Sequence, residues 1–230
     1  MSKNSHPEVR TRIERTAPEL VKAASALPAA ILADVYGRRG TLHGRITPLS
    51  PTMKVAGPAI TVEVRPGDNL MIHAALAIAQ PGDVIIVDGR ADQTCALIGE
   101  IMTTQAQQAG LAGMVLDAAV RDVEALRSNG FPIFSVGANP AGPTKFVPGR
   151  VNWPISIAGV TVNPGDLVVG DADGVVIIER ERVAEMIEAG RKKVADEQAR
   201  IKGIHEGKLV PGWLNSALDA AGVRIEDIAK

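Results

Sequence analysis

The stretch GMVLDAAVRDVEALRSNG, residues 113–130, predicts a strand, a sharp turn and a helix in succession. Residues 113–116 are apolar and suited to a strand, whereas residues 123–127 have helical composition before a glycine ends the segment. Two opposite charges, Arg121 and Asp122, stand side by side where the strand gives way to the helix. A surface turn tolerates almost any residue, so a fixed cation beside an anion at this corner is a candidate for chemistry.

Short β-like runs and helical stretches alternate on both sides of this unit. Helical patterns at 69–79, 96–109 and 123–129 interleave with apolar runs. The last runs, up to about residue 180, follow one another without a helix between them. The chain therefore predicts an α/β protein with a layered β/β/α core and not a doubly wound sheet.

Three parts follow from the change in composition along the chain. Residues 8–40 have a helical pattern, in which Pro18 and Pro28 mark breaks or first-turn positions. A charged helix begins near Arg182 and is followed by a tail. The predicted parts are an N-terminal helical segment (1–44), a β/β/α core (45–181), and a C-terminal helix and tail (182–230).

The tripeptide Pro-Gly-Asp occurs three times, at residues 66–68, 81–83 and 164–166. Proline fixes φ at the second position of a turn, and glycine supplies the positive φ that a type II turn needs at the third. The second and third copies lead directly into strand-like runs. We expect all three to be structural corners, because the chain has no phosphate-binding glycine pattern.

The composition narrows the class of protein. Hydrophobic residues make up 46% of the 230 residues, and the formal net charge is -1, so a globular chain without a basic excess is expected. The single cysteine, Cys95, excludes an intramolecular disulfide and fits a reducing compartment. The sequence shows no signal-peptide core and no apolar run of membrane-spanning length. We expect a cytoplasmic protein that binds neither nucleic acid nor membrane.

A second polar group lies upstream of the corner. Gly99 and Glu100 open a predicted helix, and twenty residues separate Glu100 from Arg121. A βαβ-like return of that size brings Glu100 to the same sheet edge as Arg121 and Asp122. Carboxylates there suit Mg²⁺, and arginine binds a planar carboxylate with two hydrogen bonds. The first-turn amides of Ile101 and Met102 are further donors for an anion.

Two structural interpretations compete with this site. Asp122 is also well placed to cap the helix that begins at Val123. Glu100 in a first helical turn is favourable beside the helix dipole without any metal. Spacing alone favours the cap for Asp122, and periodicity makes the site a candidate only.

The pattern Gly-Glu, twenty residues, Arg-Asp resembles the signature of the RraA-like family. That family includes metal-dependent 4-hydroxy-4-methyl-2-oxoglutarate/4-carboxy-4-hydroxy-2-oxoadipate aldolases. The segments VAGPAITVEVRPGDNLMIHAAL, QPGDVIIVDG, GLAGMVLDAAVRDVEAL, FPIFSVG and VNWPISIAGVTVNPGDLVVGDADGVVIIER resemble the family in the same order. The resemblance covers roughly residues 30–200 and implies a swivelling-domain-like core.

The resemblance also implies roles for single residues. Asp122 would be the direct protein ligand of Mg²⁺ or Mn²⁺, and Arg121 would bind the pyruvoyl part of the substrate. The segment 99–102 would offer backbone amides to the substrate carboxylate. Glu100, with Glu197 from a neighbouring subunit, would hold the water around the metal. Glu197 is otherwise an exposed residue of a charged helix.

The implied activity is a class II pyruvate aldolase that cleaves 4-hydroxy-2-oxo acids through a pyruvate enolate, with oxaloacetate decarboxylation as a side activity. The implied assembly is a trimer or a hexamer.

One alternative is a non-enzymatic regulator that binds an endoribonuclease; another is a dedicated 2-oxo acid decarboxylase or lyase. The presence of Asp122 favours an enzyme. For Lys145 the alternatives are an added positive charge near the anion and an ordinary loop lysine, and we expect the loop lysine. For His73 we expect a packed histidine and not a base. Glu100 replaces the aspartate of the comparable aldolases, which leaves the natural substrate open.

Overall fold

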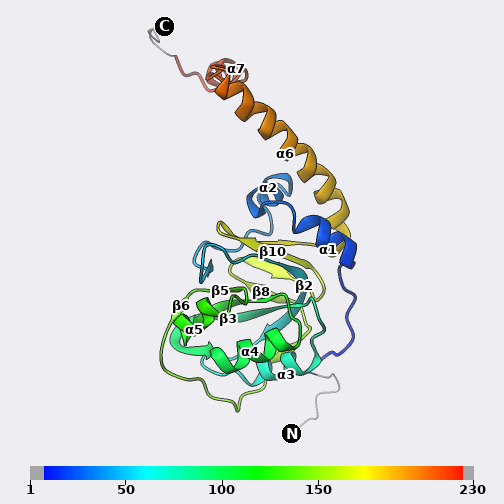
Figure 1. Cartoon of the computed structure of the whole chain (residues 1–230), viewed down its shortest axis with the longest axis vertical. Helices are drawn as coiled ribbons and strands as arrows, with labels where there is room; N and C mark the ends of the chain where they lie inside the picture. The colour runs from blue at the N-terminus through cyan, green and yellow to red at the C-terminus, as the bar shows by residue number, and fades with distance from the viewer. Residues whose placement is uncertain (1–7, 225–230) are drawn as a thin grey trace. The chain divides into compact units, whose positions relative to one another are not determined.

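The computed structural model describes residues 8–224, and Figure 1 shows its helices and strands, some of them labelled. The helices are α1 (Pro18–Ala24), α2 (Ala29–Val35), α3 (Leu70–Ile78), α4 (Glu100–Gln108), α5 (Val123–Ser128), α6 (Val183–His205) and α7 (Leu214–Ala220), with a 3₁₀ turn at Arg180–Arg182. The strands are β1 (Thr47–Pro48), β2 (Val55–Glu63), β3 (Val84–Ile98), β4 (Gly113–Val120), β5 (Ile133–Ser135), β6 (Gly137–Ala138), β7 (Arg150–Val151), β8 (Ile155–Ile157), β9 (Val160–Val162), β10 (Leu167–Asp171) and β11 (Gly174–Ile178).

One strongly curved sheet forms the core, in the order β1-β5-β4-β3-β2-β10-β11. Strands β2, β3, β4 and β5 are parallel, and β10 and β11 continue the sheet antiparallel. A bridge between Thr41 and Val176 links the segment before β1 to β11 and nearly closes the sheet. The hairpin β8-β9 makes a second, smaller sheet. The predicted layered α/β fold is confirmed.

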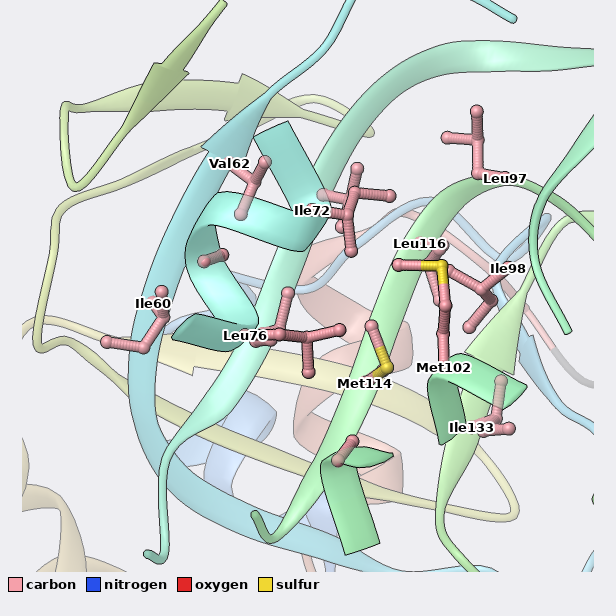
Figure 2. Packing of buried hydrophobic residues seen from close by; sticks show 14 of the residues in the cluster. Ile60, Val62, Ile72, Leu76, Leu97, Ile98, Met102, Met114, Leu116 and Ile133 are labelled. Atoms are coloured by element: carbon pink, nitrogen blue, oxygen red, sulfur yellow. The ribbon is translucent and has the colours of Figure 1, made fainter. Parts of the chain in front are cut away.

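The two faces of the central strands bury different partners. Alternate residues of β2, β3 and β4 pack against α3, α4 and α5, and Figure 2 shows this cluster around Ile60, Leu76, Met102 and Leu116. The other face carries residues such as Ile86, which pack inside the curved sheet with β8, β10 and β11. Because side chains alternate along a strand, the nearly continuous apolar runs of the sequence supply both layers.

The N-terminal segment is helical in part only. Helix α1 begins at Pro18 in its first turn, and Pro28 directly precedes α2, as the sequence predicts. Residues 8–16, which we call the strap, are not helical. Their backbone groups pair instead with Val151 and Gly165 of the core. A short isolated helix is marginal in water, so these tertiary hydrogen bonds decide the conformation.

Two further boundaries differ from the predictions. Strand β3 continues to Ile98, so the helix expected at 96–109 begins only at Glu100. The first compact unit runs to Gly190 and includes α1, α2 and the start of α6. The expected boundary at 181/182 therefore falls inside a packed region, because Val183, Met186 and Ile187 of α6 are buried.

The second unit, residues 191–230, contains the charged part of α6 and α7. It exposes several apolar side chains, namely Ile201, Ile204, Leu209, Val210, Trp213 and Val223. No helix within residues 8–224 combines the length and the apolar character that a membrane span requires.

Candidate active site

The carboxyl ends of the parallel strands β2, β3 and β4 meet at one edge of the sheet. The chain leaves these strands toward Asn69, Gly99 and Arg121 respectively. A cavity of about 110 Å³ opens there. Ligands of open α/β sheets bind at this kind of edge. The cavity is lined by Asn69, His73, Leu97, Ile98, Gly99, Ile101, Met102, Arg121, Asp122, Pro143 and Lys145.

The start of α4 and the Arg-Asp corner are in direct contact, as the spacing predicts. The amide of Glu100 donates a hydrogen bond of 3.0 Å to Asp122 Oδ2. A side chain at Gly99 would collide with that same oxygen and would press on the Arg121 side chain. Glycine is therefore required here for the close approach of two chain segments.

Asp122 has an unusual backbone conformation, with φ at 56° in the left-handed region. Asp122 occupies the N-cap position of α5, as the capping interpretation predicts, but its side chain makes no hydrogen bond to the amides of that helix. It accepts instead from the first turn of α4 through Oδ2. Within residues 8–224, Oδ1 has no hydrogen-bond partner, and the side chain is 42% exposed. Strained backbone of this kind clusters at functional sites.

Arg121 differs from the structural arginines of the molecule. Its Nε lies 3.7 Å from Asp122 Oδ2, and both side chains are 42% exposed, so this ion pair contributes little stability. By contrast, Arg45 places two nitrogens 2.8 Å from the oxygens of buried Asp117. The forked guanidinium of Arg121 thus remains available to bind the carboxylate of a ligand.

The cavity is also lined by three polar side chains to which sequence reasoning gave no role in the site, namely Asn69, His73 and Lys145. Asn69 is buried, and its Nδ2 donates to the carbonyl of Leu97 at 2.8 Å, while its Oδ1 has no partner. His73 is not simply packed, because it lines the cavity with an unpaired Nε2. Burial, followed by the nearby charge of Lys145, lowers the pKa of His73. Lys145, expected to be an ordinary loop residue, also lines the cavity.

A sequence signal for Asn69 was present. It directly follows the first Pro-Gly-Asp turn, after an apolar strand, which places it at the carboxyl end of β2. The positions at the ends of β3 and β4 were identified by the Gly-Glu and Arg-Asp pairs. The same edge argument, applied to β2, would have added Asn69 and His73.

The remaining predicted residues have mixed environments. Ile101 is 81% exposed, whereas Met102 is buried beneath the first turn of α4. Their amides lie in the turn where a helix offers no internal acceptor. Glu197 is exposed on α6 in the second unit, and Lys193 Nζ lies 3.5 Å from its carboxylate.

Comparison with known proteins defines the family. The model of the RraA-like family, described as Aldolase/RraA, matches residues 20–177, so the chain belongs to this family. A protein of Halalkalibacterium halodurans named "Putative 4-hydroxy-4-methyl-2-oxoglutarate aldolase" is 40% identical over 180 residues, which span 78% of this chain and 86% of the relative.

Solved structures share the fold. Streptomyces coelicolor RraAS2, described as an unusual member of the RNase ES inhibitor RraA protein family, is 29% identical with a TM-score of 0.75. The match spans 82% of this chain and 98% of RraAS2. An uncharacterized protein of Pseudomonas syringae is 28% identical with a TM-score of 0.73, over 85% of this chain and 96% of that protein. Names in this group therefore point both to aldolases and to regulators of an RNase.

Proposed function

We propose that this protein is a divalent-metal-dependent aldolase that cleaves 4-hydroxy-2-oxo acids to pyruvate, with oxaloacetate decarboxylation as a side activity. The observation that carries the proposal is the corner of Arg121 and Asp122. The guanidinium of Arg121 is available to bind a ligand, and Asp122 has a free carboxylate oxygen. Both residues line one cavity at the start of a helix. The relative named as an aldolase supports the same class of reaction.

The donor set fits a cation that keeps most of its water. In the part of the chain that the structure describes, no group of three or more His, Cys, Asp or Glu residues gathers around a common point. This disfavours Zn²⁺ held by protein ligands alone. Mg²⁺ and Mn²⁺ accept one or two carboxylates and retain several waters. We assign Asp122 Oδ1 as the protein ligand of such a cation, with Glu100, whose amide donates to Asp122 Oδ2, directly beside it.

The chain's own groups suffice to orient a 2-oxo acid. Arg121 binds the carboxylate of the pyruvoyl half, and the amides of Ile101 and Met102 donate to the same anion at the positive end of α4. The cavity of about 110 Å³ accommodates a fragment of pyruvate size. The rest of the substrate then extends toward Asn69, His73 and Lys145, which also line the cavity.

Cleavage transfers electrons from the breaking C3–C4 bond into a pyruvate enolate. The proton of the 4-hydroxyl group leaves, the bond breaks, and C3 later takes a proton to give pyruvate and a carbonyl product. A bound divalent cation would supply stabilisation of the enolate charge worth several kcal/mol. Arg121 adds a fixed positive charge beside the enolate oxygen. We propose that Glu100 and Glu197 receive the hydroxyl proton through water.

The proposed assembly follows from this use of Glu197. We propose a ring-shaped homo-oligomer, a trimer or a hexamer, in which Glu197 of one protomer serves the cavity of the next. Exposed apolar residues on the C-terminal unit, such as Trp213, and at the cavity mouth, such as Ile101, support burial against another copy.

The test is pyruvate release from 4-hydroxy-4-methyl-2-oxoglutarate and from oxaloacetate, each with and without Mg²⁺. Asp122→Ala should reduce both activities to near background, and added Mg²⁺ should restore little. Arg121→Lys keeps the charge and loses the fork, so it should weaken binding and turnover without abolishing metal binding. Most activity retained in Asp122→Ala would overturn the metal assignment.

A mixing experiment tests the assembly. Asp122→Ala and Glu197→Ala protomers, each inactive alone, should regain part of the activity when they exchange subunits, because some interfaces then contain both intact residues. An active monomer, or no recovery in mixtures shown to exchange, would exclude a shared site.

The second candidate function is the inhibition of an RNase, because the similar protein RraAS2 is an unusual member of the RNase ES inhibitor RraA protein family. Inhibition of a purified endoribonuclease by this chain would favour it, provided that the Asp122→Ala variant inhibits equally well. The free oxygen of Asp122 favours the aldolase, because a binding surface has no need of a residue with left-handed backbone whose carboxylate lines a cavity.

A further inference from the structure

One buried carboxylate holds the loop that carries Lys145. We call residues 139–147 the site loop. Asp68 is 1% exposed. Its Oδ2 accepts hydrogen bonds from the Thr144 hydroxyl at 2.6 Å, the Phe146 amide at 2.8 Å and the Val147 amide at 3.2 Å. A single side chain thus satisfies three donors of the loop.

The backbone beside Asp68 reinforces this attachment. The amide of Thr144 donates to the carbonyl of Gly67 at 2.9 Å, and the amide of Asn69 donates to the carbonyl of Thr144 at 3.0 Å. The other oxygen of Asp68, Oδ1, accepts from the Leu70 amide at the start of α3. The loop, the turn and the first residue of α3 therefore form one connected unit.

The site loop borders the cavity and also lies beside Arg121. Pro143 and Lys145 line it, and Gly142 lies against the guanidinium of Arg121, where a side chain would approach Nη1 within 2.9 Å. Lys145 makes no ion pair with any residue between 8 and 224, although its charge reaches His73. The loop carries a cation that the fold itself does not neutralise.

We propose that Asp68 is a positioning residue for the reaction: it fixes the site loop so that Lys145 binds the negative charge at the end of the substrate remote from Arg121. This inference rests on the proposed function. It assigns Arg121 to the pyruvoyl carboxylate and Lys145 to the distal carboxylate that 4-hydroxy-4-methyl-2-oxoglutarate and oxaloacetate both carry. Thr144 is the main side-chain link between Asp68 and the loop.

The first experiment is a double-mutant cycle on kcat/KM with Asp68→Asn and Lys145→Met. Lys145→Met should lower kcat/KM roughly tenfold, mainly by raising KM, because one charge-assisted contact is lost. Asp68→Asn should cause a similar loss in the wild-type background and almost none in the Lys145→Met background. Additive losses would overturn the proposal, because Asp68 would then act independently of Lys145.

The second experiment changes the substrate. 4-Hydroxy-2-oxopentanoate lacks the distal carboxylate, so Lys145→Met and Asp68→Asn should change its kcat/KM less than twofold. A loss as large as that seen with 4-hydroxy-4-methyl-2-oxoglutarate would overturn the proposal. A merely structural role of Asp68 would reduce turnover of both substrates alike.

Two control variants separate positioning from stability. Asp83→Asn removes a different buried aspartate of the same tripeptide and should leave kcat/KM of the folded protein unchanged. Thr144→Val should reproduce a weaker form of the Asp68→Asn effect, and Thr144→Ser should restore wild-type kinetics, which keeps the test open if Asp68→Asn folds poorly. Pyruvate release absent from the wild-type protein would overturn the proposed function together with this inference. Wild-type activity with normal kinetics in Thr144→Val would overturn the inference alone.

Discussion

The three Pro-Gly-Asp turns have the same sequence and different tasks. In all three the glycine has a positive φ, between 79° and 88°, as a type II turn requires. In the second and third copies the aspartate folds back on its own turn. Asp83 accepts from the Gln80 amide at 2.7 Å, and Asp166 accepts from the Asn163 amide at 2.8 Å.

Asp68 makes no such bond to its own turn; it binds the site loop and the start of α3. The remaining lone pairs of the other two aspartates serve the framework. Asp83 accepts hydrogen bonds from two guanidinium nitrogens of Arg15 in the strap, namely Nε and Nη2. Asp166 accepts one from the Arg180 amide. The tripeptide specifies a corner and a buried carboxylate. The groups that the topology places beside the carboxylate determine whether the aspartate stabilises the fold or positions the site.

The largest effect on stability is expected at the second turn. Asp83 is 1% exposed in its ion pair with Arg15, so Asp83→Asn leaves an arginine without its partner. The free energy of unfolding should fall by about 3 kcal/mol, since a half-broken buried pair keeps its desolvation cost. Urea denaturation measures the loss. A change below about 0.5 kcal/mol, typical of ordinary surface positions, would contradict the framework role of this copy.

The third turn should be the most sensitive to a side chain on its glycine. A Cβ at Gly165 would collide with the carbonyl of Glu14 in the strap, whereas a Cβ at Gly82 meets nothing. Gly165→Ala should cost about 2 kcal/mol or more, and Gly82→Ala about 1 kcal/mol from backbone strain alone. Thermal unfolding of both variants checks the order. Equal losses would mean that the strap adapts without cost.

The stability that Asp68 contributes at the first turn should decrease at acidic pH. Burial alone would raise the pKa of Asp68, but hydrogen bonds from Thr144 and from backbone amides outweigh it and lower the pKa. The carboxylate therefore stabilises the fold at every pH above the unfolded value of about 3.9, and this contribution is lost as the pH falls through the lower folded value. The stability difference between wild type and Asp68→Asn should be about 1–2 kcal/mol at pH 7 and shrink below about pH 4. Urea midpoints across this range measure it.

The smallest effect is expected at Asp166, where the balance has the opposite sign. Burial is the largest influence and raises the pKa of Asp166, although backbone amides oppose it. The protonated form is thus favoured in the folded state, and the associated stability declines as the pH rises through the raised value. Asp166→Asn should change the free energy of unfolding by less than about 1 kcal/mol at pH 7, because it removes this cost along with the charge. Its stability relative to wild type should improve between pH 4 and 7.

Local pattern predicted much of this molecule. Strand and helix alternation predicted the layered α/β fold, and the turn chemistry of proline and glycine predicted all three corners. The twenty-residue separation predicted the contact of Glu100 with Asp122, because a strand and a helix of those lengths return the chain to the same edge.

The errors have physical causes. The strap has a helical composition, yet its hydrogen-bond partners at Val151 and Gly165 lie too far along the chain for any local pattern to reveal them. On spacing alone, the cap of α5 was the favoured interpretation of Asp122, but with its left-handed backbone the carboxylate binds the start of α4 instead. His73 has the apolar neighbours of a core residue. It lies on α3, which follows the end of β2, and there it lines the cavity.

The strap also bears on the order of events during synthesis. The Thr16 side chain bonds to the carbonyl of Gly165, 149 residues later in the chain. At translation rates of about 5–20 residues per second, the strap leaves the ribosome about 7–30 s before that partner is made. Throughout that interval its backbone donors have only water or a chaperone to bind. The pairing of the strap with Gly165 is thus a late, long-range step of folding. Substitutions at the third turn should therefore affect folding during synthesis as well as the stability of the folded protein.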